Sequence, residues 1–118
     1  MPEAKEFPIK VCDALTATIP ISDTTSGAVD MYGATLAGII MPAAFTGTAI
    51  SFTVSDTLGG TYVALKDTAG NAISLTVSAS SAIGFEAEDL KAWRFLKVVS
   101  NATELAARAI KLIPRVVP

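Results

Sequence analysis

The sequence predicts an all-β fold, an antiparallel β-sandwich of the jelly-roll kind with about eight to nine short strands and little or no helix. Two observations favour this class. Short runs of β-branched and aromatic residues are separated by Gly, Asp, Asn, Ser and Pro at intervals of roughly 8–12 residues, the spacing of strands in sandwiches and barrels. Within these runs apolar and polar residues alternate with the period of a half-buried strand, and helical periodicity is nearly absent.

The first half of the chain contains the clearest strand, at residues 47–55, where Ile50, Phe52 and Val54 alternate with small polar residues. The run at 35–41 is almost continuously apolar and ends at a proline, so we expect a central strand covered on both faces. Earlier strands are expected at 7–12, at 15–21 with Ala17, Ile19 and Ile21 on one face, and at 28–32 with Val29 and Met31 on one face.

Two glycine-containing hairpin loops, at 56–60 and 67–71, divide the next part of the chain, because glycine supplies the positive φ that tight turns need. In the expected strand at 93–99, Trp93 and Phe95 share a face, which we interpret as core rather than as an exposed stacking platform. Further strands are expected at 61–66, 72–78, 83–85 and 107–117, with one helical turn or a loop at 86–92.

A helix over 102–112 is the competing interpretation of the last segment. Good helix formers surround Glu104 and Arg108, which are four residues apart and could form an ion pair on a helix. The strand is favoured because Pro114 and β-branched residues dominate from 110 to 117.

One core is expected for 118 residues. We predict a single domain at 9–114, with an N-terminal arm at 1–8 and a C-terminal tail at 115–118. Hydrophobic residues make up 51% of the chain and charged residues 17%, and the mean hydropathy is +0.51. This apolar content favours contacts between subunits, so we expect a homo-oligomer.

Positive charge is concentrated late in a chain whose net charge is −2, because residues 13–65 contain aspartates but no Lys or Arg. Such a basic surplus predicts an interface with an acidic partner, although charges of this kind also serve simply to solvate outward-facing strands. The predicted interface residues are Phe7, Pro8, Arg94, Lys97, Arg108, Lys111 and Arg115.

No stretch supplies the roughly 20 apolar residues of a spanning helix, and residues 1–6 lack the pattern of a secretory signal. We therefore expect a chain made in a cytosol, with no membrane partner. Cys12 is the single cysteine, which excludes an intrachain disulfide.

The sequence does not favour an enzyme. It has no histidine, the commonest general base and nitrogen metal ligand. Cys12 is expected to be a buried thiol rather than a nucleophile. Neither the acidic residues at 86–89 nor the hairpin residues Asp56 and Asp67 show the spacing of a catalytic carboxylate pair or a calcium loop, so no cofactor or metal is expected. The isoelectric point near 4.9 opposes nucleic-acid binding.

Two stretches carry a resemblance to a known family. Residues 35–56, TLAGIIMPAAFTGTAISFTVSD, are a strand, a Met-Pro-Ala-Ala-aromatic corner and a second strand ending in Ser-Asp. This pattern resembles small phage-encoded β-sandwich proteins found among virion structural genes. Residues 93–98, WRFLKV, resemble the aromatic and basic strand of discoidin-like and related jelly-roll modules.

The resemblance implies a non-enzymatic virion protein, of the cement or decoration type that stabilises a capsid lattice. Its implied partners are the major capsid protein or other virion proteins, and its implied location is the virion, assembled in the host cytoplasm. The alternative is a carbohydrate-binding sandwich on a tail or fibre, for which Tyr32, Phe45, Tyr62 and Trp93 are the candidate platforms. A small enzyme is the third and least favoured class.

Overall fold

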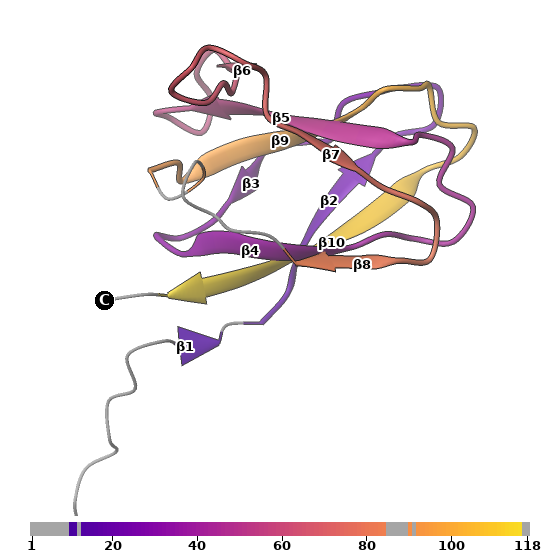
Figure 1. The fold of residues 1–118 in the computed structure, drawn as a ribbon, viewed down its shortest axis with the longest axis horizontal. Coiled ribbons are helices and arrows are strands. Elements are labelled where there is room, and N and C mark those ends of the chain that lie inside the picture. The colour runs from indigo at the N-terminus through magenta and orange to yellow at the C-terminus, as the bar shows by residue number, and fades with distance from the viewer. Residues whose placement is uncertain (1–9, 12, 85–89, 91, 117–118) are drawn as a thin grey trace, which may run out of the picture.

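Two antiparallel β-sheets pack face to face in the computed structural model, which describes residues 10–11, 13–84, 90 and 92–116 (Figure 1). The prediction of an all-β sandwich is confirmed. The first sheet contains β1 (Lys10–Val11), β2 (Leu15–Ile19), β4 (Thr35–Ile40), β8 (Ala82–Gly84) and β10 (Arg108–Val116). The second sheet contains β3 (Val29–Asp30), β5 (Ala49–Ser55), β6 (Val63–Ala64), β7 (Ser74–Thr76) and β9 (Phe95–Ser100).

The strand order is that of a jelly roll, as predicted. In the first sheet β10 lies between β4 and the edge formed by β1 and β2, and β8 flanks β4 on the other side. In the second sheet the order is β3, β9 and β5, with β6 and β7 sharing the free edge of β5. The chain therefore crosses repeatedly between the sheets, and its first and last long strands are neighbours.

The core lies between the sheets and is built by residues that alternate along each strand. Ile50, Phe52 and Val54 of β5 are 2% exposed or less, as their spacing predicts. Leu96 and Val98 of the neighbouring β9 are completely buried beside them. Ala17, Ile19, Leu36, Ile39, Ile110 and Leu112 of the first sheet face this layer.

The last segment is a strand, and the helical alternative for 102–112 is wrong for its second half. Ile110 and Leu112 are buried while Ala109 and Lys111 are exposed, a period of two that only a strand places on one face. Glu104 and Arg108 do pair, but across the loop that precedes β10. β10 also runs through Arg115 to Val116, into the segment assigned to the C-terminal tail.

Pro114 interrupts β10 because it has no N–H to donate. On the β4 side the register slips between Ile113 and Pro114, which leaves Ala37 as an extra residue. On the other side the pairing with β2 stops at Leu112 and the pairing with β1 begins at Arg115.

Three expectations about side-chain faces are wrong. β4 is covered on one face only, because the jelly roll has two layers, and Ile40 on its outer face is 42% exposed. Phe95 lies on the outer face of β9, since Leu96 and Val98 take the core positions; Trp93, which precedes β9, packs partly against the core. Ile21 is 62% exposed because β2 ends at Ile19 and the chain turns at Pro20.

Candidate functional site

The predicted cationic residues lie in three different places. Arg94 and Lys97 lie beside one another on the outer face of the second sheet, at the start of β9. Lys111 and Arg115 lie on the outer face of the first sheet, on β10. Arg108 is only 13% exposed and is bound to Glu104. Phe7 and Pro8 fall outside the described residues, as do Cys12 and the acidic cluster at 86–89.

Arg94 is the centre of a polar and aromatic group on the second sheet. Its Nε and Nη2 donate to the two carboxylate oxygens of Asp30 at 2.8 and 3.0 Å. The guanidinium carbon lies 5.0 Å from the centroid of the Phe95 ring and 5.9 Å from that of Tyr32, within the range of cation–π attraction. The hydrogen bonds from Arg94 are the main cause of a lowered pKa of Asp30, so this carboxylate stays ionised.

Tyr32 is displayed at a tight turn and is 73% exposed. Its φ of +54° and the φ of +82° at Gly33, with the Ala34 N–H donating to the Met31 carbonyl at 2.9 Å, define a type I′ turn. Asp30 Oδ1 also accepts the Tyr32 N–H at 2.8 Å. A bulky residue in the left-handed region is strained, and such strain clusters at functional sites.

A second cation and ring extend this group along the sheet. Lys97 Nζ lies 4.5 Å from the centroid of the Tyr62 ring. The Tyr62 hydroxyl donates to the Leu58 carbonyl at 2.7 Å, and burial, followed by the charge of Asp30, raises the pKa of Tyr62. The hydroxyl of Thr53, which lies opposite Lys97 in the ladder, is buried without a hydrogen-bond partner among the described residues. We call Asp30, Tyr32, Tyr62, Arg94, Phe95 and Lys97 the aromatic–cation patch.

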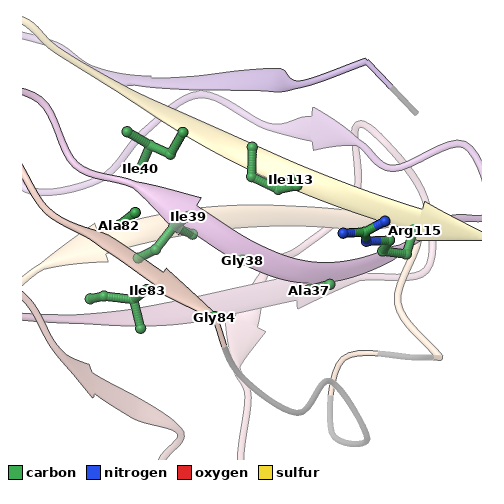
Figure 2. A pocket seen from close by; sticks show the side chains of 9 residues that line it. All are labelled: Ala37, Gly38, Ile39, Ile40, Ala82, Ile83, Gly84, Ile113 and Arg115. Carbon is green, nitrogen blue, oxygen red and sulfur yellow. The ribbon is translucent and has the colours of Figure 1, made fainter. Parts of the chain in front are cut away.

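The outer face of the first sheet carries a different feature, an open hollow of about 410 Å³ (Figure 2). Its floor is a cross-strand glycine pair, Gly38 of β4 opposite Gly84 of β8. Because neither glycine has a side chain, the surface is low at this pair, and the side chains of Ile40, Ala82 and Ile113 form the sides of the hollow. Figure 2 places Arg115 at one end. We call this feature the glycine-floored hollow.

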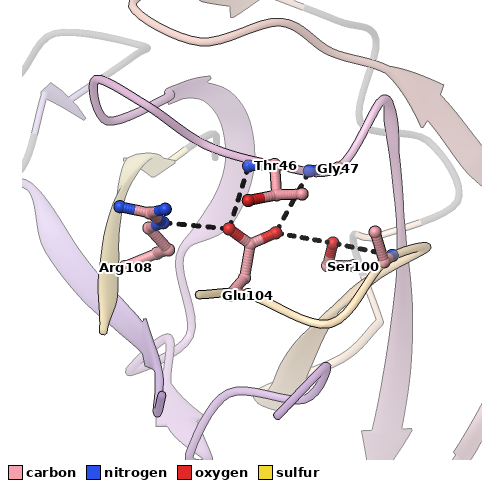
Figure 3. Close-up of polar contacts among 6 residues, drawn as sticks. Thr46, Gly47, Ser100, Glu104 and Arg108 are labelled. Carbon is pink, nitrogen blue, oxygen red and sulfur yellow. Dashed lines mark hydrogen bonds and ion pairs between the residues drawn. The ribbon is translucent and has the colours of Figure 1, made fainter. Parts of the chain in front are cut away.

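A buried carboxylate organises one end of the sandwich (Figure 3). Glu104 is 0% exposed, and its oxygens accept the N–H groups of Thr46 at 2.9 Å and Gly47 at 3.1 Å. They also accept Ser100 Oγ at 3.1 Å and Arg108 Nε at 2.9 Å. A Cβ at Gly47 would collide with the Ser100 hydroxyl, so only glycine permits this close approach.

Four hydrogen bonds therefore decide the ionisation of Glu104. Burial raises its pKa, but the hydrogen bonds from Thr46, Arg108, Gly47 and Ser100 outweigh burial, so that the net pKa is lowered. The carboxylate is charged, fully enclosed and satisfied. Its role is to join the loop before β5 to the loop before β10.

Other polar candidates are also occupied within the fold. The Asp67 carboxylate accepts the N–H groups of Ala69 and Asn71, both at 2.9 Å, and so closes its own hairpin loop. Within the described part of the chain, no three His, Cys, Asp or Glu residues are grouped to hold a metal ion. No helix among these residues is long and apolar enough to cross a membrane.

Of the four aromatic platforms considered, the structure presents one fully. Tyr32 is exposed, Tyr62 and Trp93 are half-buried, and Phe45 is 6% exposed in the core. Sequence reasoning selected Arg94 and Lys97 but missed Asp30 as the anchor of Arg94. The residue pair Tyr32 and Gly33 between two strands was the available signal for a tight turn.

The strand order defines a jelly-roll sandwich. The aromatic–cation patch lies on the outer face of its second sheet, and the glycine-floored hollow lies on the outer face of its first sheet. Comparison with protein-family models, with curated proteins and with solved structures gave no match. The fold class is thus established by the strand pairing alone.

Proposed function

We propose that this chain is a non-enzymatic structural protein of a bacteriophage particle, a cement or decoration protein that docks on the major capsid lattice through the aromatic–cation patch. The observation that carries the proposal is the exposed pair Tyr32 and Arg94, which the Asp30 carboxylate holds, with the half-buried Phe95 ring beside Arg94.

The composition of the patch fits a protein-binding surface. Tyrosine and arginine are the residues most enriched at the energetic centres of protein interfaces. Here both are held before any partner arrives, Arg94 by two hydrogen bonds and Tyr32 by its turn. A preorganised surface loses less conformational entropy on binding, so a small area suffices for a specific contact.

The phage assignment is supported by the resemblance of residues 35–56, which form β4, the corner after it and β5. A repeated lattice also suits a small patch. Copies that are joined to one another bind several neighbouring sites on one particle at once, so their combined affinity exceeds that of a single copy. Head and tail locations are both consistent with this chemistry, and the capsid is the location we propose.

The test uses purified chain and particles of the encoding phage that lack it. Mass spectrometry of normal particles should detect the chain, and added wild-type protein should co-sediment with the deficient particles. We expect Arg94→Ala and Tyr32→Ala each to raise the half-saturating concentration at least tenfold, the loss typical of an interface centre. Thr18→Ala, on the exposed face of β2 and outside both the aromatic–cation patch and the glycine-floored hollow, is the control and should bind like wild type.

Two outcomes would refute the proposal. One is absence of the chain from purified particles. The other is unchanged particle binding by both patch variants while they remain folded.

The exposed Tyr32 ring beside the Asp30–Arg94 pair favours one second candidate, a carbohydrate-binding module on a tail or fibre. An aromatic face next to hydrogen-bonding side chains suits a sugar ring. Binding to a glycan array that is lost in Tyr32→Ala would support this candidate, and an array without any binding would exclude it from consideration.

A further inference from the structure

We propose that copies of this chain associate head to tail, with an apolar tip of one copy, Ile21 and Leu105, seated in the glycine-floored hollow of a second copy. The inference rests on the proposed building role, but it uses surfaces distinct from the aromatic–cation patch.

The hollow is a preformed receptor for an aliphatic side chain. Ile40, Ala82 and Ile113 surround the glycine floor, so the hollow is mainly apolar and open to the outside. A Cβ built on Gly84 meets no atom of the described residues within 4 Å, so these residues leave the space above β8 open. Its position on an exposed sheet face leaves room for a second molecule.

The tip is a preformed protrusion at an end of the sandwich. Leu105 is 76% exposed and Ile21 is 62% exposed, the first and third most exposed large hydrophobic residues in the described part of the chain. The Ser22 N–H donates to the Glu104 carbonyl at 2.9 Å, and the Glu104 N–H donates to the Asp23 carbonyl at 3.0 Å. These two bonds place the chain at Ile21 beside the chain at Leu105.

The tip is also held rigidly. The Glu104 side chain that precedes Leu105 is fixed by its four partners in the interior. Exposed leucine and isoleucine on a fixed loop cannot withdraw into the core of their own copy. Burial against a second copy removes their apolar surface from water without a cost for ordering the loop.

Charge favours a second copy as the occupant. The strands of the first sheet contain no Asp or Glu. Arg115 lines the hollow, and Lys111 lies on the same outer face. Lys111 is directly opposite Ile40 in the ladder. The tip carries the exposed Asp23 and has no unpaired cation among the described residues nearby, since Arg108 is bound to Glu104. The tip is therefore apolar like the hollow, and its charge is opposite in sign to that around the hollow.

The two surfaces are different parts of the chain, so the contact is heterologous. Each copy offers its tip to one neighbour and its hollow to another, so association continues past a dimer, either into a closed ring or into an open filament. An isologous dimer through the first sheet would instead bring Lys111 and Arg115 of both copies together.

Sedimentation velocity of the purified full chain over micromolar to millimolar concentrations tests the inference. We expect wild type to form species larger than a dimer as its concentration rises. Leu105→Ser removes the tip and Gly84→Val fills the hollow, and each should leave a folded monomer over the same range. Leu58→Ser removes an exposed leucine elsewhere, 54% exposed, and should associate like wild type.

Mixing the two monomeric variants gives the sharpest result. Gly84→Val retains its tip and Leu105→Ser retains its hollow, so an equimolar mixture should form a one-to-one heterodimer and nothing larger. A wild type that stays monomeric, variants that still associate, or a mixture that remains monomeric would each overturn the inference.

This result is separate from the test of the proposed function. Association is measured on the chain alone, whereas particle docking is measured with Arg94→Ala and Tyr32→Ala. A chain that associates but does not bind particles would refute the proposed function and leave the head-to-tail contact standing.

Discussion

Two arginine–carboxylate pairs among the described residues have almost the same distance from Nε to the carboxylate and opposite surroundings. Arg108 Nε lies 2.9 Å from Glu104, and the side chains are 13% and 0% exposed. Arg94 Nε lies 2.8 Å from Asp30, and the side chains are 56% and 19% exposed. The same chemistry therefore joins loops inside the protein at one end and presents a charged, aromatic surface on the second sheet.

The difference shows that burial, and not the length of the ion pair, decides what such a pair does. Removing one partner of a buried pair leaves a charge that water cannot reach, which is strongly destabilising. An exposed pair is solvated whether or not it forms and contributes little to folding. The buried pair is thus expected to govern stability and the exposed pair to govern recognition.

The largest effect is expected when the buried carboxylate is removed. Glu104→Ala leaves Arg108 and two main-chain N–H groups without an acceptor, and should cost about 3–5 kcal/mol of unfolding free energy. Urea denaturation followed by circular dichroism measures this loss. Glu104→Gln keeps the shape but lacks the charge, and should lose less. A loss below about 1 kcal/mol in both variants would contradict the role assigned to Glu104.

Acid is expected to break the same pair by protonation. The pKa of Glu104 is lowered in the folded state, so the stability it contributes is present above its unfolded pKa. That stability is lost as the pH falls through the lower, folded pKa. Urea midpoints of wild type should therefore fall steeply below about pH 4, and those of Glu104→Gln should fall less. Asp30→Asn is the control and should keep most of the wild-type acid dependence.

The exposed pair should separate recognition from stability. Arg94→Ala and Asp30→Asn should leave the thermal midpoint nearly unchanged, because both side chains are solvated when unpaired. Both should weaken particle binding, the first by removing the cation and the second by releasing it from its fixed position. A large drop in the thermal midpoint of either variant would show that the exposed pair, like the buried pair, stabilises the fold.

The smallest effect is expected at the turn beside Arg94. Tyr32→Gly removes the side chain that makes a φ of +54° unfavourable, whereas Tyr32→Ala removes the ring but keeps a Cβ. The glycine variant should be more stable than the alanine variant by about 1 kcal/mol in thermal unfolding. Equal stabilities would show that the turn carries no strain.

Much of the fold was predictable from the sequence because its strands alternate cleanly. Ile50, Phe52 and Val54 occupy the positions that their spacing assigns to the core. The outer exposure of β4 was not predictable from its apolar run, since the pairing of Gly38 with Gly84 depends on register between distant strands. Phe95 was misplaced because the alternation in β9 alone does not say which of its two faces is covered.

The candidate sites were predictable only in part. A surplus of late cations draws attention to Arg94, Lys97, Lys111 and Arg115, but their division between two sheets follows from the order in which β9 and β10 enter the sandwich. Asp30 lies 64 positions from Arg94 in the sequence, and no local pattern connects them. Interface function itself remains a prediction.

The interruption at Pro114 divides β10 into two segments, and we expect their amide hydrogens to exchange separately. Beyond Pro114, Arg115 pairs with Val11 and with Thr35, apart from the ladder that Lys111 and Leu112 form with β2 and β4. Opening of this outer segment leaves the pairing of Lys111 and Leu112 with β2 and β4 in place, so we expect it to require less free energy than global unfolding. Arg115 also lies at the glycine-floored hollow. We therefore expect a molecule bound in the hollow to slow hydrogen exchange at the Val11 and Arg115 amides. Exchange at the Leu112 amide should not change, because the stability of the core sets its rate.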